Sequence, residues 1–300
     1  MSSTPFSRIV LLGETGYIGS RLAAALRAAA PDVPLVGRSA PTLDLTAPTA
    51  AAALEAILDP DGALVVCAAI KKQLGDTPEI FEQNLAIALN VCRALDARPV
   101  RRVVFFSSAA VYGEDVQHGV IDESTAVEPT SLYGIGKFTA ERLLARTAAQ
   151  KNIPLLILRP ALVYGPHEPA YYYGPSGFLR SAVVGVPITL WGDGGELREF
   201  LFVDDVVAIA AALTFGEATG VLNLVSGTSY TYAQALAEIA RLIGREPALN
   251  ARPRTKAKVD HRFDNARLRR ACAGCRFTPL GEALRRVAAD VSAVAESTHR

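Results

Sequence analysis

The sequence has little cysteine and almost no net charge. Only 4 of its 300 residues are cysteine, too few for the disulfide framework of a small secreted domain. The 31 basic and 30 acidic residues give a formal net charge of +1, which argues against a general binder of nucleic acid or of an acidic membrane surface. Because 50% of the residues are hydrophobic, the chain can bury a large core, which excludes a wholly disordered protein.

The sequence also lacks a long apolar run and a leader-like start. The apolar segment at residues 9–12 is followed almost at once by Glu14, unlike a secretory signal peptide. The longest uncharged stretch, residues 218–237, is rich in Asn, Gln, Ser, Thr and Gly, unlike a bilayer-spanning helix. We therefore expect a cytoplasmic protein of one or two domains, with no membrane segment and no nucleic-acid partner.

Short apolar runs alternate with helical patterns over the first 160 residues. Strands are expected at 9–12, 35–37, 63–67, 103–106 and 155–158, where the runs are short and rich in Val, Ile and Leu. Helices are expected between them, at about 18–30, 49–58, 79–95 and 132–149. This alternation predicts an α/β fold with a doubly wound parallel sheet of the Rossmann type.

The pattern changes after residue 160. Five prolines between positions 160 and 187, among many Gly and Tyr residues, predict loops and short elements. A helix at 204–213, a strand at 221–225 and a Thr-capped helix at about 232–243 are expected beyond them. These segments predict a smaller C-terminal α/β domain beside the main sheet.

A glycine-rich loop joins the first expected strand to the first expected helix. Its glycines are Gly13, Gly16 and Gly19. In a dinucleotide-binding fold the first glycine permits a tight turn, the second lets the backbone approach a pyrophosphate, and the third lets the helix pack on the strand. Because the loop stands at the start of a strand–helix–strand series, it predicts a dinucleotide site. Contacts to the cofactor are also expected from Thr15, Tyr17 and Ile18.

The end of the second expected strand bears on which dinucleotide binds. An acidic residue there, about 20 residues beyond the loop, would bind the ribose 2′-hydroxyl of NAD and repel a 2′-phosphate. The sequence has Gly37 and Arg38 instead, and Arg38 would attract that phosphate. We therefore expect NADP(H) to be favoured, with NAD(H) as the alternative.

A serine pair, a tyrosine and a lysine predict the catalytic chemistry. Ser107 and Ser108 follow the fourth expected strand, and Tyr133 and Lys137 lie one helical turn apart on one face. A lysine beside a phenol lowers the pKa of the phenol, and a serine hydroxyl can orient a substrate carbonyl or alcohol. We expect Ser108, Tyr133 and Lys137 to form a proton relay for hydride transfer at a nicotinamide.

Further motifs accompany these residues along nearly the whole chain. They are Asp44-Leu45, Ala68-Ala69, Asn84 and the segments 107–113, 158–166, 191–195, 198–205, 264–268 and 279–284. With them the chain resembles the extended short-chain dehydrogenases/reductases, the NAD(P)-dependent epimerase/dehydratase group that acts on nucleotide sugars.

The resemblance implies a role for individual residues. Ser108 would contact the sugar, Tyr133 would be the acid/base, and Lys137 would bind the nicotinamide ribose. Arg198, and more weakly Arg254, would bind the diphosphate of the substrate, because planar guanidinium groups suit phosphate. Further contacts to the cofactor would come from Asp44, Leu45, Ala68, Ala69, Ser107 and Pro160.

These expectations divide the chain into two domains. We expect residues 1–160, with 200–228 returning to them, to form a NAD(P)-binding Rossmann domain. Residues 161–199 and 229–300 would form the smaller domain that binds the nucleotide sugar. A homodimer is expected through the helices at 79–95 and 132–149, whose apolar positions include Leu85, Leu89, Cys92, Leu143 and Leu144.

Differences from the family pattern narrow the expected reaction. Ala109 and Ala110 follow Ser108, where the dehydratases of this family have carboxylates and the GDP-fucose synthases have a cysteine at the position of Ala110. We therefore expect reduction of the 4-keto group of a nucleoside-diphosphate-4-keto-6-deoxyhexose. A nucleotide-sugar 4-epimerase with retained NAD is the alternative, and a non-catalytic dinucleotide-sensing regulator is a third possibility.

Three other features leave alternatives open. Cys272 and Cys275 have the spacing of half a zinc site, but no second Cys/His pair accompanies them, so we expect reduced thiols and no metal site. His167 is either a substrate contact or an ordinary loop residue. The run of Tyr171, Tyr172 and Tyr173 either lines the substrate pocket or forms a surface loop.

Overall fold

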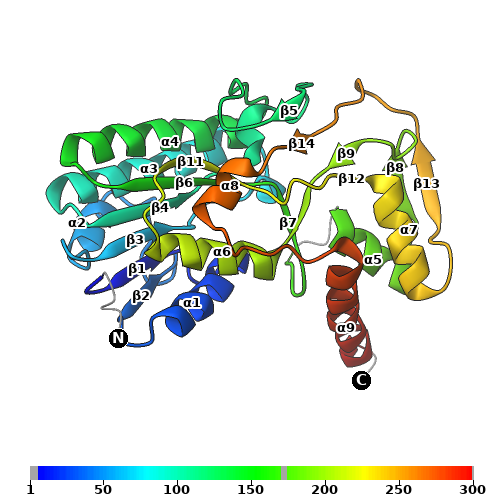
Figure 1. Cartoon of the computed structure of the whole chain (residues 1–300), viewed down its shortest axis with the longest axis horizontal. Coiled ribbons are helices and arrows are strands. Elements are labelled where there is room, and N and C mark those ends of the chain that lie inside the picture. The colour runs from blue at the N-terminus through cyan, green and yellow to red at the C-terminus, as the bar shows by residue number, and fades with distance from the viewer. Residues whose placement is uncertain (1–5, 170–173, 299–300) are drawn as a thin grey trace.

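A six-stranded parallel sheet forms the centre of the computed structural model, which describes residues 6–169 and 174–298 (Figure 1). The strands lie in the order β11 (Gly220–Leu224), β6 (Leu155–Pro160), β4 (Arg102–Phe106), β3 (Ala63–Val66), β1 (Ile9–Leu12) and β2 (Leu35–Arg38). Every residue of β1, β3 and β4 is buried, because a strand covered on both faces needs apolar side chains on both. This order confirms the expected doubly wound sheet of the Rossmann type.

Helices cover both faces of the sheet (Figure 1). One face packs against α2 (Ala50–Glu55), α3 (Pro78–Ala97) and α4 (Leu132–Lys151). The other packs against α1 (Tyr17–Ala29), α6 (Val203–Phe215) and α8 (Ala266–Ala271). Two apolar cores result, one on each side of the sheet.

Local chemistry moves the ends of two expected helices. The helix α3 starts one residue earlier than expected, because Pro78 takes its first position and Thr77 Oγ1 accepts a hydrogen bond from the Ile80 N–H at 3.4 Å. The helix α2 is shorter than expected and ends at Glu55. The turn that follows it buries Leu58, which is 2% exposed, ahead of a proline.

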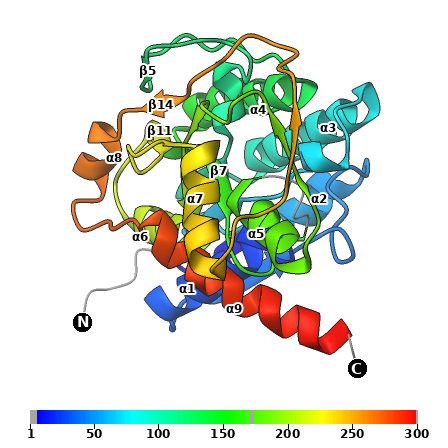
Figure 2. The same cartoon turned by 90° about the vertical axis from the view of Figure 1, so that its right-hand side faces the viewer.

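A smaller unit adjoins the sheet and faces the viewer in Figure 2. It comprises α5 (Gly174–Val184), α7 (Tyr232–Ile243), α9 (Leu280–Thr298) and the paired strands β8 (Ile188–Trp191) and β13 (Leu249–Arg252). The three helices and β8 share a third apolar core, whereas β13 is exposed. Short strand pairs lie between it and the main sheet: β7 (Leu162–Tyr164) with β10 (Phe200–Phe202), and β9 (Leu197–Arg198) with β12 (Tyr230–Thr231). No helix in the described part of the chain is both long and apolar enough to cross a bilayer.

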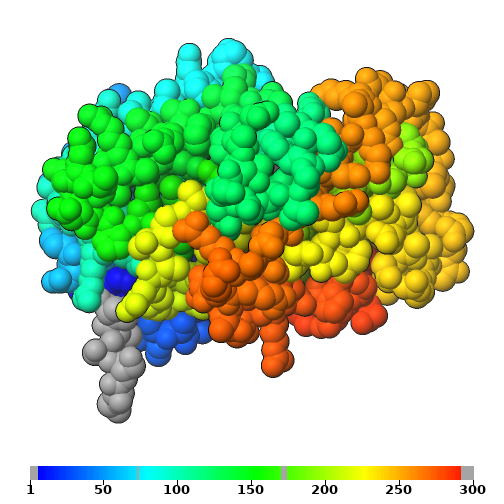
Figure 3. Space-filling view, turned by 45° about the horizontal axis from the view of Figure 1, so that its top comes forward, coloured from blue at the N-terminus to red at the C-terminus, as the bar shows by residue number. Residues whose placement is uncertain are grey.

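A further strand pair ties the segment after β4 to a segment near the C-terminus. The strands are β5 (Val120–Ile121) and β14 (Arg262–Phe263). In Figure 3 the green surface of the first segment abuts the orange surface of the second. Nearby, Lys256 Nζ lies 2.6 Å from Asp115 Oδ2. These contacts close one side of the cavity described below.

The helices α3 and α4 lie side by side, as expected for the face of a dimer (Figure 1). Cys92 is 7% exposed and Leu144 is 1% exposed, and both belong to the core of this chain. The prediction that these two side chains face a second protomer is therefore wrong. Leu85, Leu89 and Leu143 are only partly buried, and the dimer itself stays a prediction.

Candidate active site

The glycine loop lies where the strand order of the sheet reverses. The strand β1 lies between β2 and β3. A crevice therefore forms at the carboxyl ends of β1 and β3. Gly13 has a φ of +87°, and a Cβ there would lie 2.8 Å from the Ala68 nitrogen. A Cβ at Gly19 would overlap the carbonyl oxygen of Gly13. Only glycine fits at these two positions, so the loop backbone stays bare towards the crevice.

A cavity of about 260 Å³ opens at this loop. Twelve of the residues predicted from the sequence line it: Gly13, Gly16, Tyr17, Ile18, Gly19, Ala68, Ala69, Ser107, Ser108, Tyr133, Lys137 and Pro160. A bare backbone cradle at the N-terminus of α1 suits a pyrophosphate. The residues present therefore fit a dinucleotide.

Four of the predicted cofactor contacts do not line this cavity. The Thr15 N–H donates to Ser39 Oγ at 2.9 Å, and Arg38 ends β2, where its guanidinium donates to its neighbour's carbonyl. Asp44 accepts a hydrogen bond from Thr46 at 2.7 Å. The side chain of Leu45 packs into the core beneath the loop and is 7% exposed.

The first two turns of α4 hold Tyr133 and Lys137. Ser131 Oγ accepts the Gly134 N–H at 3.1 Å, and Asp76 Oδ1 accepts the Tyr133 N–H at 2.8 Å. Lys137 Nζ lies 5.9 Å from the centroid of the Tyr133 ring and donates to the Phe106 carbonyl at 2.7 Å. Burial lowers the pKa of Lys137 to about 8. The amine is therefore held beside the phenol by backbone contacts.

The two serines have different surroundings. Ser108 Oγ accepts the Ala110 N–H at 3.1 Å where η2 (Ala109–Tyr112) begins. Ser108 lines both the cavity at the glycine loop and a second, larger cavity described below. Ser107 is 4% exposed, and its hydroxyl donates to Glu141 Oε1 at 2.5 Å. Of the two serines, only Ser108 lines both cavities.

A buried ion pair behind the serines was not expected from the sequence. Arg159 donates to both oxygens of Glu141, at 2.9 and 2.6 Å, and to the Tyr112 hydroxyl at 2.9 Å. The Tyr112 hydroxyl in turn donates to Asn223 at 2.8 Å. A buried charged network is stable only when every member is paired. The spacing of positions 133, 137 and 141 along one helix face could have pointed to Glu141.

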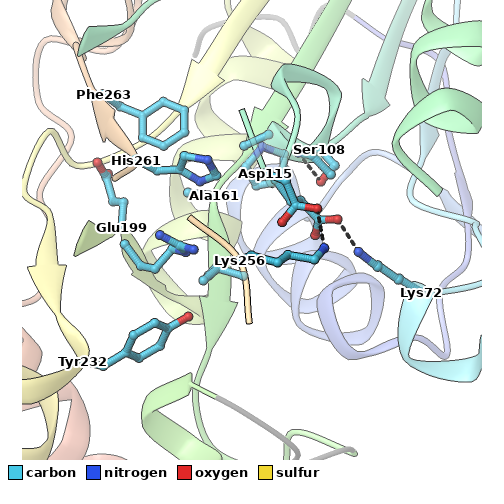
Figure 4. Close-up of a pocket in the computed structure, with 15 residues that line it drawn as sticks. Lys72, Ser108, Asp115, Ala161, Glu199, Tyr232, Lys256, His261 and Phe263 are labelled. Carbon is cyan, nitrogen blue, oxygen red and sulfur yellow. Dashed lines mark hydrogen bonds and ion pairs between the residues drawn. The ribbon is translucent and has the colours of Figure 1, made fainter. Parts of the chain in front are cut away.

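A larger cavity of about 740 Å³ extends from Ser108 towards the smaller unit (Figure 4). Its charged lining residues are Lys72, Glu114, Asp115, Arg198, Glu199 and Lys256. Lys72 pairs with Glu114, and Lys256 pairs with Asp115. The volume lies within the usual range of roughly 300–1,000 Å³ for small-molecule sites.

Of the two arginines predicted to bind phosphate, Arg198 lines this cavity and Arg254 is not among its lining residues. Arg198 donates to the Val259 carbonyl at 2.6 Å and to Glu196 at 3.2 Å. Arg254 pairs with the same Glu196 and lies 2.8 Å from Asp193. Glu196 thus contacts both guanidinium groups, and a phosphate that reaches Arg198 competes with it.

Burial shifts two titratable groups of the larger cavity. It raises the pKa of Glu199 to about 7, although the Ser226 and Gly227 N–H groups donate to this carboxylate. It lowers the pKa of His261 to about 4, and the charge of Arg198 adds to that effect. The imidazole is therefore neutral at neutral pH, and the carboxyl is partly protonated.

The remaining residues singled out by the sequence lie away from this chemistry. The His167 N–H donates to Asp290 at 2.6 Å, and its ring pairs with the same carboxylate. Cys272 and Cys275 are free thiols. Over residues 6–169 and 174–298, no group of three or more His, Cys, Asp or Glu side chains is placed to hold a metal ion. Tyr171, Tyr172 and Tyr173 lie outside the described residues.

Known proteins share this architecture. The chain is 30% identical over 171 residues to the uncharacterized UDP-glucose epimerase YtcB of Bacillus subtilis, which is 56% of this chain and 52% of that protein. It is 29% identical over 258 residues to a 3-diazoavenalumate denitrifying reductase of a Streptomyces species, which is 80% of this chain and 83% of that protein. The structure resembles that of MoeE5 in complex with UDP-glucose and NAD, with a TM-score of 0.81, 26% identity and coverage of 97% of this chain and 99% of that one.

The matches cover different shares of this chain and of the proteins it resembles. The chain spans about half or less of the length of the curated relatives that it matches first. The model of the NAD dependent epimerase/dehydratase family matches residues 9–224, which include the glycine loop, the serine pair, Tyr133 and Lys137. This chain therefore belongs to the NAD dependent epimerase/dehydratase family.

Proposed function

We propose that this protein is a 4-ketoreductase that acts on a nucleoside-diphosphate-4-keto-6-deoxyhexose. The observation that carries the proposal is the position of Ser108 on both cavities, with Tyr133 and Lys137 beside it on the first. One cavity suits a dinucleotide, and the other has room for a second ligand. We also propose that residues 161–199 and 229–300 form the substrate-binding domain and that the rest binds the cofactor.

Each catalytic side chain has one task in this proposal. When bound, the nicotinamide cofactor supplies the hydride, and Arg38 by itself favours NADP(H). Ser108 holds the carbonyl oxygen of the substrate, and Tyr133 donates a proton to it. Lys137 stabilises the phenolate that remains, so the amine has to be charged, which its pKa of about 8 allows at neutral pH.

The surroundings of Ser108 support reduction rather than elimination of water. Ala109 and Ala110 place no carboxylate directly after it. The nearby carboxylates of the cavity, Glu114 and Asp115, are paired with lysines. Elimination would need an acid and a base free to exchange protons with the sugar. The Streptomyces relative is also named as a reductase.

A nucleotide-sugar 4-epimerase is the second candidate. The same three side chains could serve both directions of proton transfer, and the larger cavity has space for a keto sugar to turn. The name of the Bacillus relative, and the UDP-glucose and NAD in the MoeE5 complex, favour this alternative.

The decisive assay offers both reactions to the purified protein. Reduction is measured as the loss of NADPH or NADH absorbance with a nucleoside-diphosphate-4-keto-6-deoxyhexose, and with the free keto sugar as comparison. We expect turnover of the nucleotide-linked substrate only. Equal rates with the free sugar would contradict the proposal, and conversion of UDP-glucose to UDP-galactose without added cofactor would replace it by the epimerase.

The role of the phenol is tested by Tyr133→Phe. We expect turnover to fall by about 10²–10⁴-fold, the usual contribution of a general acid, while the dissociation constant of the cofactor stays close to that of the wild type. The matched control is Tyr230→Phe, because Tyr230 lies on β12 and lines neither cavity of the site. Activity of Tyr133→Phe within threefold of the wild type would show that another group donates the proton.

A further inference from the structure

The structure places a carboxylate at the end of β2, although the sequence has none at that point. Dinucleotide-binding folds recognise the adenosine ribose there, usually through an acidic residue of the strand end itself. In this chain Gly37 and Arg38 occupy that end. A Cβ built at Gly37 would overlap Oε2 and Cδ of Glu14. The carboxylate of Glu14, from the glycine loop, therefore fills the volume of the missing side chain.

Contacts on both sides hold Glu14 in this position. Arg27 lies 2.7 Å from its Oε1, while Oε2 is the atom nearest Gly37. The Gly13 and Glu14 N–H groups both donate to the Arg38 carbonyl, at 2.7 and 3.3 Å. The Glu14 side chain is 27% exposed, half as much as that of Arg27 at 55%. The loop and the strand end thus form one surface, with the carboxylate built into it.

We propose that Glu14 recognises the adenosine ribose and selects NAD(H) over NADP(H). Its carboxylate would accept a hydrogen bond from the 2′-hydroxyl and repel a 2′-phosphate. This inference rests on the proposed function only in that it requires a dinucleotide, and it reverses the preference that Arg38 alone predicts. Arg27 is already paired with Glu14, and Arg38 donates to the Gly37 carbonyl at 2.8 Å.

The two positions depend on each other. A side chain at position 37 would have to displace the carboxylate of Glu14 from its place against the strand end. The carboxylate at the strand end comes from the loop and not from the strand itself. A variant with an acidic residue at position 37 and none at position 14 therefore tests the inference directly.

The first measurement is the affinity for NADH and NADPH without any sugar, by titration calorimetry. We expect the wild type to bind NADH at least about tenfold more tightly than NADPH. The carboxylate of Glu14 would gain a hydrogen bond from the 2′-hydroxyl of NADH and would repel the 2′-phosphate of NADPH, and one such charged contact accounts for a difference of this size. Glu14→Gln keeps the size of the side chain but removes its charge, so NADPH should bind more tightly and the ratio should fall at least severalfold. The matched control is Glu217→Gln, an exposed glutamate in the loop between α6 and β11, which should leave the ratio unchanged.

The second measurement moves the carboxylate. Gly37→Asp alone should weaken binding of both dinucleotides, because two carboxylates would compete for one space. Glu14→Ala should lose the preference for NADH, and the double variant Glu14→Ala/Gly37→Asp should regain it. Thermal unfolding of each variant shows whether it is folded.

Several outcomes would overturn the inference. The wild type could bind NADPH more tightly than NADH and lose NADPH binding in Arg38→Ala. The ratio of the NADH and NADPH affinities could also stay unchanged in Glu14→Gln. A protein that selects NADH yet reduces no nucleotide sugar would uphold this inference and refute the proposed function. Binding of neither dinucleotide would overturn both.

Discussion

Two carboxylates lie close to arginines that the sequence predicts to bind phosphate groups. Glu196 contacts both arginines that the sequence predicts for a diphosphate, and Glu14 lies against Gly37 at the end of β2. Neither acid belongs to a motif that indicates its partner. In both cases a carboxylate near a predicted phosphate-binding arginine comes from another position of the chain. Glu196 pairs with Arg198, and Glu14, which pairs with Arg27, lies against Gly37 beside Arg38. The local charge therefore includes the carboxylate as well as the arginine.

We predict that Glu196→Gln strengthens binding of a nucleotide sugar. Removal of the carboxylate frees the charge of Arg198 for the diphosphate, so KM should fall about threefold to tenfold, equal to about 0.7–1.4 kcal/mol. Arg198→Ala should raise KM strongly while the dissociation constant of the cofactor stays unchanged.

Steady-state kinetics with the nucleotide-linked substrate measures both effects. Glu238→Gln is the control, because Glu238 pairs with Arg241 on α7 and lines neither cavity of the site. If KM is the same in Glu196→Gln and in the wild type, the diphosphate does not lie at Arg198.

A second prediction concerns the dependence of stability on pH through Glu199. Its pKa is about 7 in the folded protein against 4.5 for the free group, so the folded state binds this proton more tightly. The stabilisation from this group is complete below pH 4.5 and is lost as pH rises through 7. Glu199→Gln should therefore flatten the loss of stability in that range and raise the free energy of unfolding at pH 8 by about 1–3 kcal/mol.

Urea unfolding at several pH values between 4 and 8 measures this difference. The Ser226 and Gly227 N–H groups donate to Oε1 of Glu199, and a glutamine oxygen can accept them equally. A variant that is less stable than the wild type at pH 8 would show that the ionised carboxylate is needed there.

Among the helices, the start of α4 positions the phenol of Tyr133. Two side chains meet the free N–H groups of its first turn: Ser131 on its own chain segment and Asp76 from the segment before α3. The serine follows a known capping pattern and can be recognised locally. The aspartate comes from 57 positions before Tyr133, so only the packing of α3 against α4 brings it there.

We predict that Ser131→Ala and Asp76→Ala each lower the free energy of unfolding by about 1 kcal/mol, the usual effect of an N-cap or of a charge at a helix start. Asp76→Ala should also lower kcat without changing cofactor affinity, because the backbone of Tyr133 loses its anchor. Urea unfolding and steady-state kinetics measure the two effects. Asp96→Ala, near the other end of α3, is the control, and an equal loss of kcat there would remove the special role of Asp76.

For the protein in solution, we predict a homodimer formed by α3 and α4 of two protomers. Leu85, Leu89 and Leu143 keep part of their surface accessible on these helices, and burial of such surface favours association. Light scattering should give twice the monomer mass of 31.8 kDa. Leu89→Glu should produce monomers, whereas Leu249→Glu, on the exposed strand β13, should not. A wild type that is monomeric at micromolar concentration contradicts this prediction.

Local sequence patterns were enough to predict the sheet, the glycine loop and the pairing of Tyr133 with Lys137. Each of these depends on spacing over a few residues: buried parallel strands need continuous apolar runs, and side chains four apart share a helix face. The same local rules placed Cys92 and Leu144 on apolar faces but could not say whether the chain's own core or a partner covers them.

The charged side chains that meet could be identified only in the folded chain. Glu14 lies against Gly37, Arg159 pairs with Glu141, and Asp76 reaches the start of α4. These contacts join segments that are distant in sequence, and a carboxylate can pair with any cation that packing brings within a few ångströms. Electrostatic partners follow from the packing of whole elements, so the motif at Arg38 could not show that the carboxylate of Glu14 lies against the neighbouring Gly37.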